Sequence, residues 1–311
     1  MTEASGPAMS SPHATPPNPN FELRLRRHPD VETKVTALDE HRDFAAYAKA
    51  YGDRLADWYE QDHLIVLPHV SLPGDINYLS GVTLPERFKK VGLTSGIARH
   101  LVAERLPDGN FKLENPLWES GLKPLEIIYL HQQIVAITSY LLHAVPRLFP
   151  HYRLVDGTGN ITFRLCPTRN EGMHIDHYSK ATVGSQEHRL KLFINLDSEQ
   201  RYWRIGDTIF TLIRKLRDRL PRQLPETINE VSGLVNELLA DVPAHDLLYP
   251  RLSCIIGNGE TIAHQVLYGN RVIGFEWRVD PATMVNPGGL AYHRLQQIRA
   301  AETAVRAGPQ S

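Results

Sequence analysis

The stretch 174–196, HIDHYSKATVGSQEHRLKLFINL, contains the two patterns on which the predicted fold and function depend. Its second half alternates, with leucine or isoleucine at positions 190, 192, 194 and 196. Successive side chains of a β-strand point to opposite faces, so this alternation predicts a strand over 189–196 with one apolar face. The other face would carry Arg189, Lys191, Phe193 and Asn195. The first half of the stretch contributes His174 and Asp176, two positions apart.

Further strand-like runs surround this one. Within 160–165, Ile, Phe and Leu occupy alternate positions, with Thr162 and Arg164 between them. This spacing predicts a second strand whose two faces differ in polarity. Glycine and asparagine at 257–259 and 269–270 are typical of turns. The remaining strand-like runs lie at 63–69, 252–256, 261–266 and 272–279.

Helical periodicity is confined to four other segments. Apolar residues recur at helical spacing over 39–60, and a proline at position 124 opens a second predicted helix that continues to about 142. A helical insertion is predicted over about 207–240, interrupted near two prolines. A final helix is predicted over about 290–306.

These elements predict a mainly β protein with helical support, built as a sandwich or barrel. At 311 residues, the chain is long enough for one large domain or two small ones. Residues 1–20, rich in Pro, Ser and Ala, are predicted to be disordered. The predicted order after this tail is a helical support region with an N-terminal strand (21–150), a β core carrying the 207–240 insertion (151–285), and a C-terminal helix and tail (286–311).

Composition excludes several classes of function. There are 34 basic and 35 acidic residues, so the chain has no net positive charge that would attract nucleic acid or an anionic membrane. The two cysteines are too few for a disulfide framework or a thiolate metal site, and they favour a reducing cytoplasm. We find no signal-peptide pattern and no apolar run of membrane-spanning length. We therefore expect a small-molecule substrate; the sequence does not specify the oligomeric state.

The pair His174 and Asp176 is distinguished by its context, because the spacing alone is common. Among 15 histidines, His28 and His41 are also followed two positions later by an aspartate. His28 lies in a basic entry segment, and His41 begins a predicted helix, where residues two apart point to different sides. In extended backbone, residues two apart project from one face. Only His174 and Asp176 are therefore placed to converge on one ion.

A third ligand is predicted at His264, in a strand-like run about ninety residues further along. Two imidazoles and one carboxylate on one face of a metal leave positions open for other ligands, which is typical of non-haem Fe(II) oxygenases. The same donors also suit Mn(II) and Zn(II). A metal-dependent hydrolase or isomerase on the same barrel therefore stays open, although no HExxH helix accompanies the trio. A metal-free binding barrel is a further alternative.

Five features carry a resemblance to a known family: His174-Ile175-Asp176, Thr182-x-Gly184, the basic strand 189–195, Arg201-x-Trp203-Arg204-x-Gly206 and His264-Gln-Val-Leu-Tyr-Gly-Asn. With them the chain resembles the Kdo 3-hydroxylases, which hydroxylate an acidic eight-carbon sugar of bacterial lipopolysaccharide. More broadly, the spacing looks like that of the double-stranded β-helix Fe(II)/2-oxoglutarate oxygenases. The specific match covers 174–210 and 254–280, about a fifth of the chain.

The resemblance implies a double-stranded β-helix (jelly-roll, cupin-like) core and an Fe(II)/2-oxoglutarate-dependent dioxygenase that uses O2. His174, Asp176 and His264 would bind the iron. The implied reaction is hydroxylation of a small polar substrate, such as a sugar acid or a nucleoside-like compound. Desaturation or cyclisation in secondary metabolism stays open, because these reactions use the same iron ligands.

A 2-oxoglutarate enzyme also needs a cation for the distal carboxylate of the co-substrate. Lys191, on the basic strand, and Arg278, on the strand after His264, are the two candidates, and the sequence leaves the choice open. Where this chain has Lys191, the Kdo 3-hydroxylases have arginine. For a polar substrate, the predicted contacts are Arg164, His177, Tyr178 and Arg201.

Overall fold

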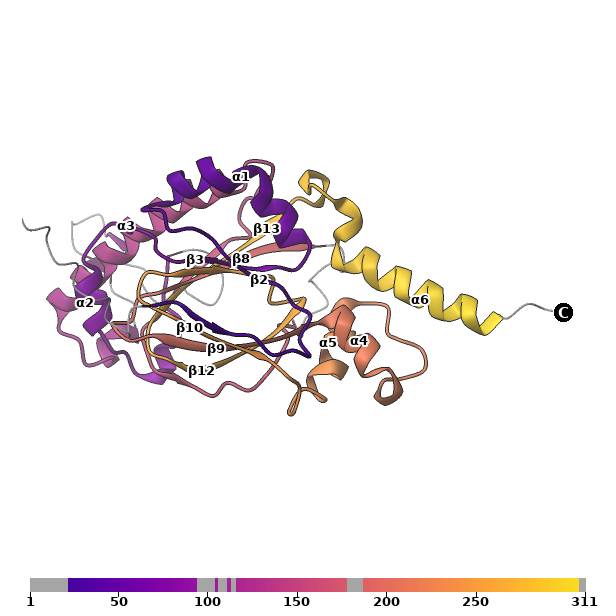
Figure 1. Cartoon of the computed structure of the whole chain (residues 1–311). Coiled ribbons are helices and arrows are strands. Elements are labelled where there is room, and N and C mark those ends of the chain that lie inside the picture. Colours follow the sequence, from indigo (N-terminus) through magenta and orange to yellow (C-terminus); the bar gives the residue numbers. More distant parts are fainter. Residues whose placement is uncertain (1–21, 94–103, 106–110, 113–115, 178–186, 308–311) are drawn as a thin grey trace, which may run out of the picture.

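The computed structural model describes residues 22–93, 104–105, 111–112, 116–177 and 187–307 (Figure 1). The tail predicted to be disordered, 1–20, lies outside these ranges, as does the candidate substrate contact Tyr178.

Two β-sheets lie face to face at the centre of the molecule (Figure 1). The first has the strand order β1 (Arg24–Arg26), β10 (His245–Tyr249), β9 (Arg201–Thr208), β12 (Ile262–Gly269) and β7 (Thr168–Arg169). The second has the order β2 (Val35–Ala37), β3 (Leu64–Leu67), β11 (Cys254–Ile256), β8 (His188–Asn195), β13 (Val272–Val279) and β6 (Asn160–Arg164). Apart from β2 and β3, which run parallel, neighbouring strands of both sheets are antiparallel. A separate two-stranded antiparallel sheet pairs β4 (Glu104–Arg105) with β5 (Phe111–Lys112).

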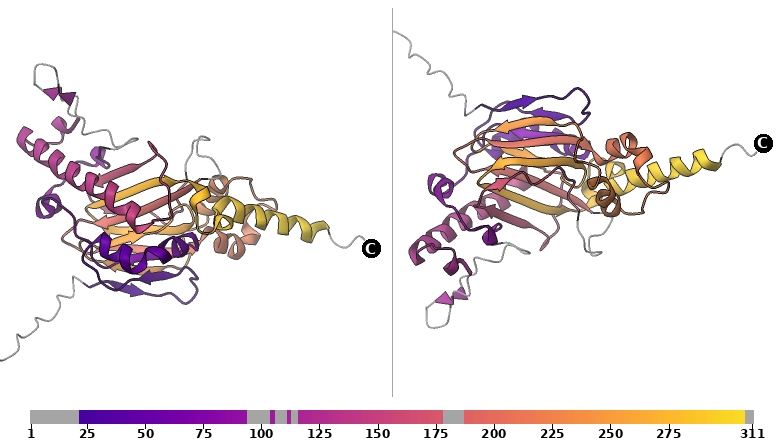
Figure 2. Two further views of the ribbon diagram at one scale, coloured as in Figure 1. Left: turned by 90° about the horizontal axis from the view of Figure 1, so that it is seen from above. Right: turned by 90° about the horizontal axis from the view of Figure 1, so that it is seen from below.

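Helices α1 (Phe44–Glu60) and α3 (Pro124–Leu148) cover the outer face of the second sheet (Figures 1 and 2). Asp43 caps α1 by accepting a hydrogen bond from the backbone N–H of Ala46 at 2.8 Å. The carboxylate of Glu126 accepts one from the backbone N–H of Lys123 at 2.7 Å, so α3 begins at Pro124 as predicted. The short helix α2 (Ile76–Gly81) follows β3.

A second group of helices packs at one end of the sheets: α4 (Ile209–Lys215), α5 (Ile228–Asn236) and α6 (Ala291–Ala307). Ile175, between the two candidate ligands, is buried in the apolar cluster that these helices form. The far end of α6 extends away from the body of the molecule (Figure 1). Short 3-10 turns lie at Glu86–Phe88, Pro116–Glu119, Arg217–Arg219, Pro281–Thr283 and Pro287–Gly289.

The predicted alternation of β6 and β8 is confirmed. Leu190, Leu192 and Ile194 are buried in the core cluster that contains residues of α1 and α3. The opposite face of β8 points between the sheets, where the ring of Phe193 lies 5.1 Å from the ring of Trp203 on β9. One face of the strand therefore builds the core, and the other is available for a site.

Other boundaries differ from the predicted ones. The segment 39–43 precedes α1 in non-helical conformation, and α3 continues six residues beyond 142. The predicted insertion over 207–240 begins at Ile209, because the preceding residues belong to β9. Strands β9 and β10 have no counterpart among the predicted strands. Among the described residues, no helix has both the length and the apolar character needed to cross a membrane.

His188, at the start of β8, should make stability depend on pH. Its ring is buried between Tyr59 and Tyr152, and burial lowers its pKa to about 4. The unfolded imidazole titrates near 6.5, so between these values the unfolded state binds more protons. The free energy of unfolding should therefore fall as the pH drops from about 6.5 to 4, by about 3 kcal/mol from this group.

Urea unfolding at several pH values checks this, with H188Q expected to lose most of this pH dependence. H143Q, on the exposed face of α3, is the matched control for removing an imidazole. Equal pH dependence in wild type and H188Q would show that another group is responsible.

Candidate metal centre

Backbone pairing brings the predicted ligands together. His174 and His264 form an isolated antiparallel bridge, in which each donates its N–H to the carbonyl of the other, at 2.9 and 2.8 Å. The N–H of Asp176 donates to the carbonyl of Gly259 at 2.8 Å. The segment after β7 is thereby fastened along the start of β12 and the turn before it.

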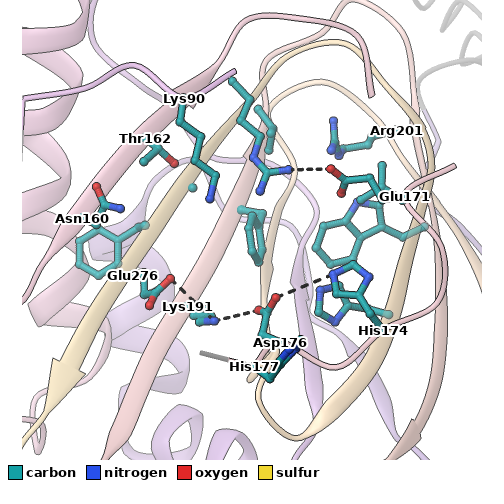
Figure 3. A pocket seen from close by; sticks show the side chains of 18 residues that line it. Lys90, Asn160, Thr162, Glu171, His174, Asp176, His177, Lys191, Arg201 and Glu276 are labelled. Atoms are coloured by element: carbon teal, nitrogen blue, oxygen red, sulfur yellow. Dashed lines mark hydrogen bonds and ion pairs between the residues drawn. The ribbon is translucent and has the colours of Figure 1, made fainter. Parts of the chain in front are cut away.

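The three side chains converge on one point. One donor atom from each of His174, Asp176 and His264 lies within 4.8 Å of the others. The Nε2 atom of His174 is 3.8 Å from Oδ1 of Asp176 (Figure 3). The structure therefore assembles the predicted trio as a group that could hold a metal ion.

The two imidazoles are in the tautomer that metal binding requires. Nδ1 of His174 lies 2.9 Å from the carbonyl oxygen of Gly172, and Nδ1 of His264 lies 3.0 Å from that of Ile262. A carbonyl can only accept, so each Nδ1 carries a proton, and in the neutral ring Nε2 is then the nitrogen that can bind a metal. Burial also lowers the pKa of His264, which favours its neutral form.

Asp176 is held as a carboxylate by its neighbours. Nζ of Lys191, whose side chain is only 3% exposed, lies 2.8 Å from Oδ2 of Asp176. Burial alone would raise the pKa of this carboxyl, but the charge and the hydrogen bond of Lys191 outweigh that effect and lower it well below its usual range. The candidate oxygen ligand is therefore ionised.

The trio lies on the wall of a cavity of about 260 Å³ between the two sheets. The lining mixes apolar and charged side chains, as small-molecule sites do. Trp203 stacks against His264, with ring centroids 5.7 Å apart. The other lining residues include Lys90, Asn160, Thr162, Arg164, Glu171, His177, Lys191, Phe193, Arg201 and Glu276.

Arg201 is almost fully buried in this lining. Its side chain is 1% exposed, and Gly269 leaves the space it occupies, since a Cβ at that glycine would overlap Nη1 of Arg201. Within the described part of the chain, Nε and Nη1 have no hydrogen-bond partner. Burial lowers the pKa of this guanidinium. By contrast, Nη1 of Arg164 lies 3.3 Å from the Glu171 carboxylate.

Four of the other sequence candidates reach the cavity, and Arg278 does not. Arg164, His177, Lys191 and Arg201 line it. Nη1 of Arg278 instead forms an ion pair with Glu187 at 2.7 Å, and Arg278 is not among the lining residues.

Sequence reasoning did not single out several residues of the lining. Glu276 faces Lys191 because their strands pair in register, which no local pattern reveals. Lys90 follows a 3-10 turn far from the ligands in the chain. Trp203 belongs to the Arg201-x-Trp203 element noted in the sequence, but the sequence did not predict that its ring would stack on His264.

No family model matches the sequence, and no curated protein matches it. Solved structures do match. The apo structure of the Kdo hydroxylase KdoO, a non-heme Fe(II) alphaketoglutarate dependent dioxygenase, aligns with a TM-score of 0.63 at 14% identity, covering 86% of this chain and 96% of that one. KdoO in complex with alphaketoglutarate and Fe(III) aligns with a TM-score of 0.60 at 13% identity over the same shares. KdoO in complex with succinate and Fe(III) aligns with a TM-score of 0.61 at 14% identity, covering 90% of this chain and 99% of that one. The chain therefore shares the fold of KdoO.

A side chain at Gly259 should destroy the centre. A Cβ there would overlap Oδ2 of Asp176 and would come 3.2 Å from Cε1 of His264. Because Lys191 holds the carboxylate in place, G259A should displace it and weaken binding of Co(II) about tenfold or more in titration calorimetry. G233A, in α5, is the control, since its Cβ meets nothing within 4 Å. Wild-type affinity in G259A would contradict this geometry.

Proposed function

We propose that this chain is an Fe(II)/2-oxoglutarate-dependent dioxygenase that hydroxylates a small polar substrate. The convergence of His174, Asp176 and His264 on a cavity wall carries the proposal. Two imidazole nitrogens and one carboxylate oxygen, with room beside them, match the donor set of non-haem iron oxygenases. The shared fold with KdoO, whose solved complexes contain Fe(III) with alphaketoglutarate or succinate, supports it.

We also propose that the core is a double-stranded β-helix of the jelly-roll, cupin-like type. The course of the chain supports this: β6, β8, β11 and β13 belong to one sheet, and β7, β9, β10 and β12 to the other. Apart from the step from β9 to β10, each strand in this series crosses to the opposite sheet. The strands β1, β2 and β3 would then extend the two sheets at one side.

The residues present fit iron. Both Nε2 atoms can bind a metal when the rings are neutral, the carboxylate is ionised, and no cysteine is among the lining residues of the cavity. With its co-substrate, a bound Fe(II) supplies the oxidising chemistry. The protein's part is to fix the ligands, orient both organic molecules and exclude water. The stacking of Trp203 on His264 and the position of the cavity between two sheets contribute to this.

For the distal carboxylate of 2-oxoglutarate we propose Arg201, in preference to Lys191 or Arg278. Lys191 contacts Asp176. Arg278 is paired with Glu187 away from the lining. Nε and Nη1 of Arg201 are buried without a hydrogen-bond partner in the described part of the chain, and such groups cost free energy unless a ligand satisfies them. A carboxylate can pair with a guanidinium through two hydrogen bonds.

For the substrate we propose an anionic, hydroxylated molecule such as a sugar acid. Lys90, Thr162 and Asn160 lie on the side of the cavity away from Arg201 (Figure 3). An ammonium, a hydroxyl and an amide suit a carboxylate and sugar hydroxyls. Arg164 and His177 remain predicted contacts on the same lining. KdoO, whose fold this chain shares, is a Kdo hydroxylase, which is consistent with this class of substrate.

The metal assignment predicts that H174A loses both bound iron and activity. Removing one of three ligands should lower iron content to background and stop succinate formation from 2-oxoglutarate. Metal analysis and a succinate assay check this, with H143A on the exposed face of α3 as the control. An H174A protein with wild-type metal content would exclude the trio. Metal-dependent hydrolysis without 2-oxoglutarate would instead favour the hydrolase alternative.

The co-substrate assignment predicts that R201M raises the KM for 2-oxoglutarate. Loss of a buried, charged hydrogen-bond pair should increase KM by about tenfold or more. R278M removes the alternative cation and should leave KM unchanged, which makes it the matched control. If R278M raises the KM for 2-oxoglutarate and R201M does not, Arg278 binds the distal carboxylate instead.

A further inference from the structure

Lys191 lies at the centre of a row of alternating charges behind the metal centre. Its ammonium is 2.8 Å from Oδ2 of Asp176 on one side and 3.7 Å from Oε2 of Glu276 on the other (Figure 3). The other carboxylate oxygen of Glu276 accepts a hydrogen bond from Nη1 of Arg189 at 2.7 Å. Arg189 in turn pairs with Glu187 at 2.9 Å and with Glu260 at 2.8 Å. The row therefore continues across β8 and β13.

The backbone fixes where this ammonium can lie. Lys191 and Glu276 are direct partners in the antiparallel register of β8 and β13. The backbone N–H of Lys191 donates to the hydroxyl of Tyr59 at 3.1 Å, and that hydroxyl donates to the carbonyl of Arg189. With its side chain almost fully buried, Lys191 is held between two carboxylates before any ligand binds.

The two oxygens of Asp176 consequently face different partners. Oδ2 accepts a hydrogen bond from the ammonium, and Oδ1 lies 3.8 Å from Nε2 of His174. A metal ion at the trio would meet Oδ1, because reaching Oδ2 as well would require displacement of Lys191.

The difference matters for the number of open positions. An octahedral ion with three single-atom protein ligands keeps three positions for other molecules. A keto acid that chelates through two atoms takes two of them and leaves one. If Asp176 also chelated through both oxygens, none would remain.

Resting on the function proposed above, we propose that Lys191 is a positioning residue that occupies one oxygen of Asp176 and confines this carboxylate to a single-oxygen contact with the metal. This role differs from that of a co-substrate anchor. In this role the Lys191 ammonium also competes with the metal ion for Asp176. Its positive charge lies close to the metal and repels it.

The test uses the full-length chain loaded with Co(II), whose visible absorption reports coordination number and geometry. In K191M, which removes the charge and keeps an unbranched side chain, Asp176 can chelate, so the intensity of the Co(II) bands should change. The dissociation constant for Co(II) should fall several-fold, because the competing like charge is gone. A lysine with a merely structural role would give weaker metal binding when removed.

K191R should keep the wild-type spectrum, since it retains a cationic donor. K49M, on the exposed face of α1, controls for the loss of a lysine. The affinity of Co(II)-loaded K191M for 2-oxoglutarate should stay within about threefold of wild type, because Arg201 carries the distal carboxylate in this assignment. Circular dichroism confirms folding, and K191Q replaces K191M if that variant does not fold.

An unchanged Co(II) spectrum in K191M overturns the inference. If affinity for 2-oxoglutarate then falls tenfold or more, Lys191 is the co-substrate anchor instead. Failure of the proposed function gives a different pattern, in which the folded wild-type chain binds Co(II) no better than H174A. If wild type binds Co(II), H174A does not, and K191M matches wild type, only the role of Lys191 is wrong.

Discussion

The two backbone hydrogen bonds between His174 and His264 are the interaction on which the site depends. They join the segment leaving β7 to the start of β12, and the bond from Asp176 to Gly259 extends the pairing. Side chains two apart on extended backbone share a face, so this pairing brings His174 and Asp176 beside His264, and Lys191 then holds the Asp176 carboxylate. Ile175, between the first two, points the other way into the apolar cluster of α4, α5 and α6, which anchors the segment.

Charge balance is the second constraint on the cavity. Buried charges are costly unless paired, and the pairs between Lys191 and Asp176, and between Arg189 and Glu276, meet that cost on one wall. Arg201 is the exception, because two of its nitrogens have no hydrogen-bond partner in the described part of the chain. Leaving buried donors unsatisfied lowers the stability of the fold, and this observation is the basis for proposing that Arg201 binds an anionic ligand.

Strands with clean alternation could be predicted from the sequence, and those with polar residues at buried positions could not. β8 and β6 place leucine, isoleucine or phenylalanine on every second residue, because one face of each strand packs against helices. β9 instead buries Arg201 and Trp203, which line the cavity, and Asp207, which accepts a hydrogen bond from Lys215. A pattern of mixed charge and aromatic residues does not resemble a core strand, so the local sequence does not predict β9.

The sequence by itself determined the three candidate ligands, because their residue types and the extended spacing of His174 and Asp176 restrict which groups can share an ion. It also determined the apolar faces that build the core. Only the tertiary structure decided which cations reach the cavity. Lys191, Arg201 and Arg278 are all cationic residues on strands. Their different surroundings arise from strand register and from closure of one sheet over the other, which depend on contacts between residues distant in the chain.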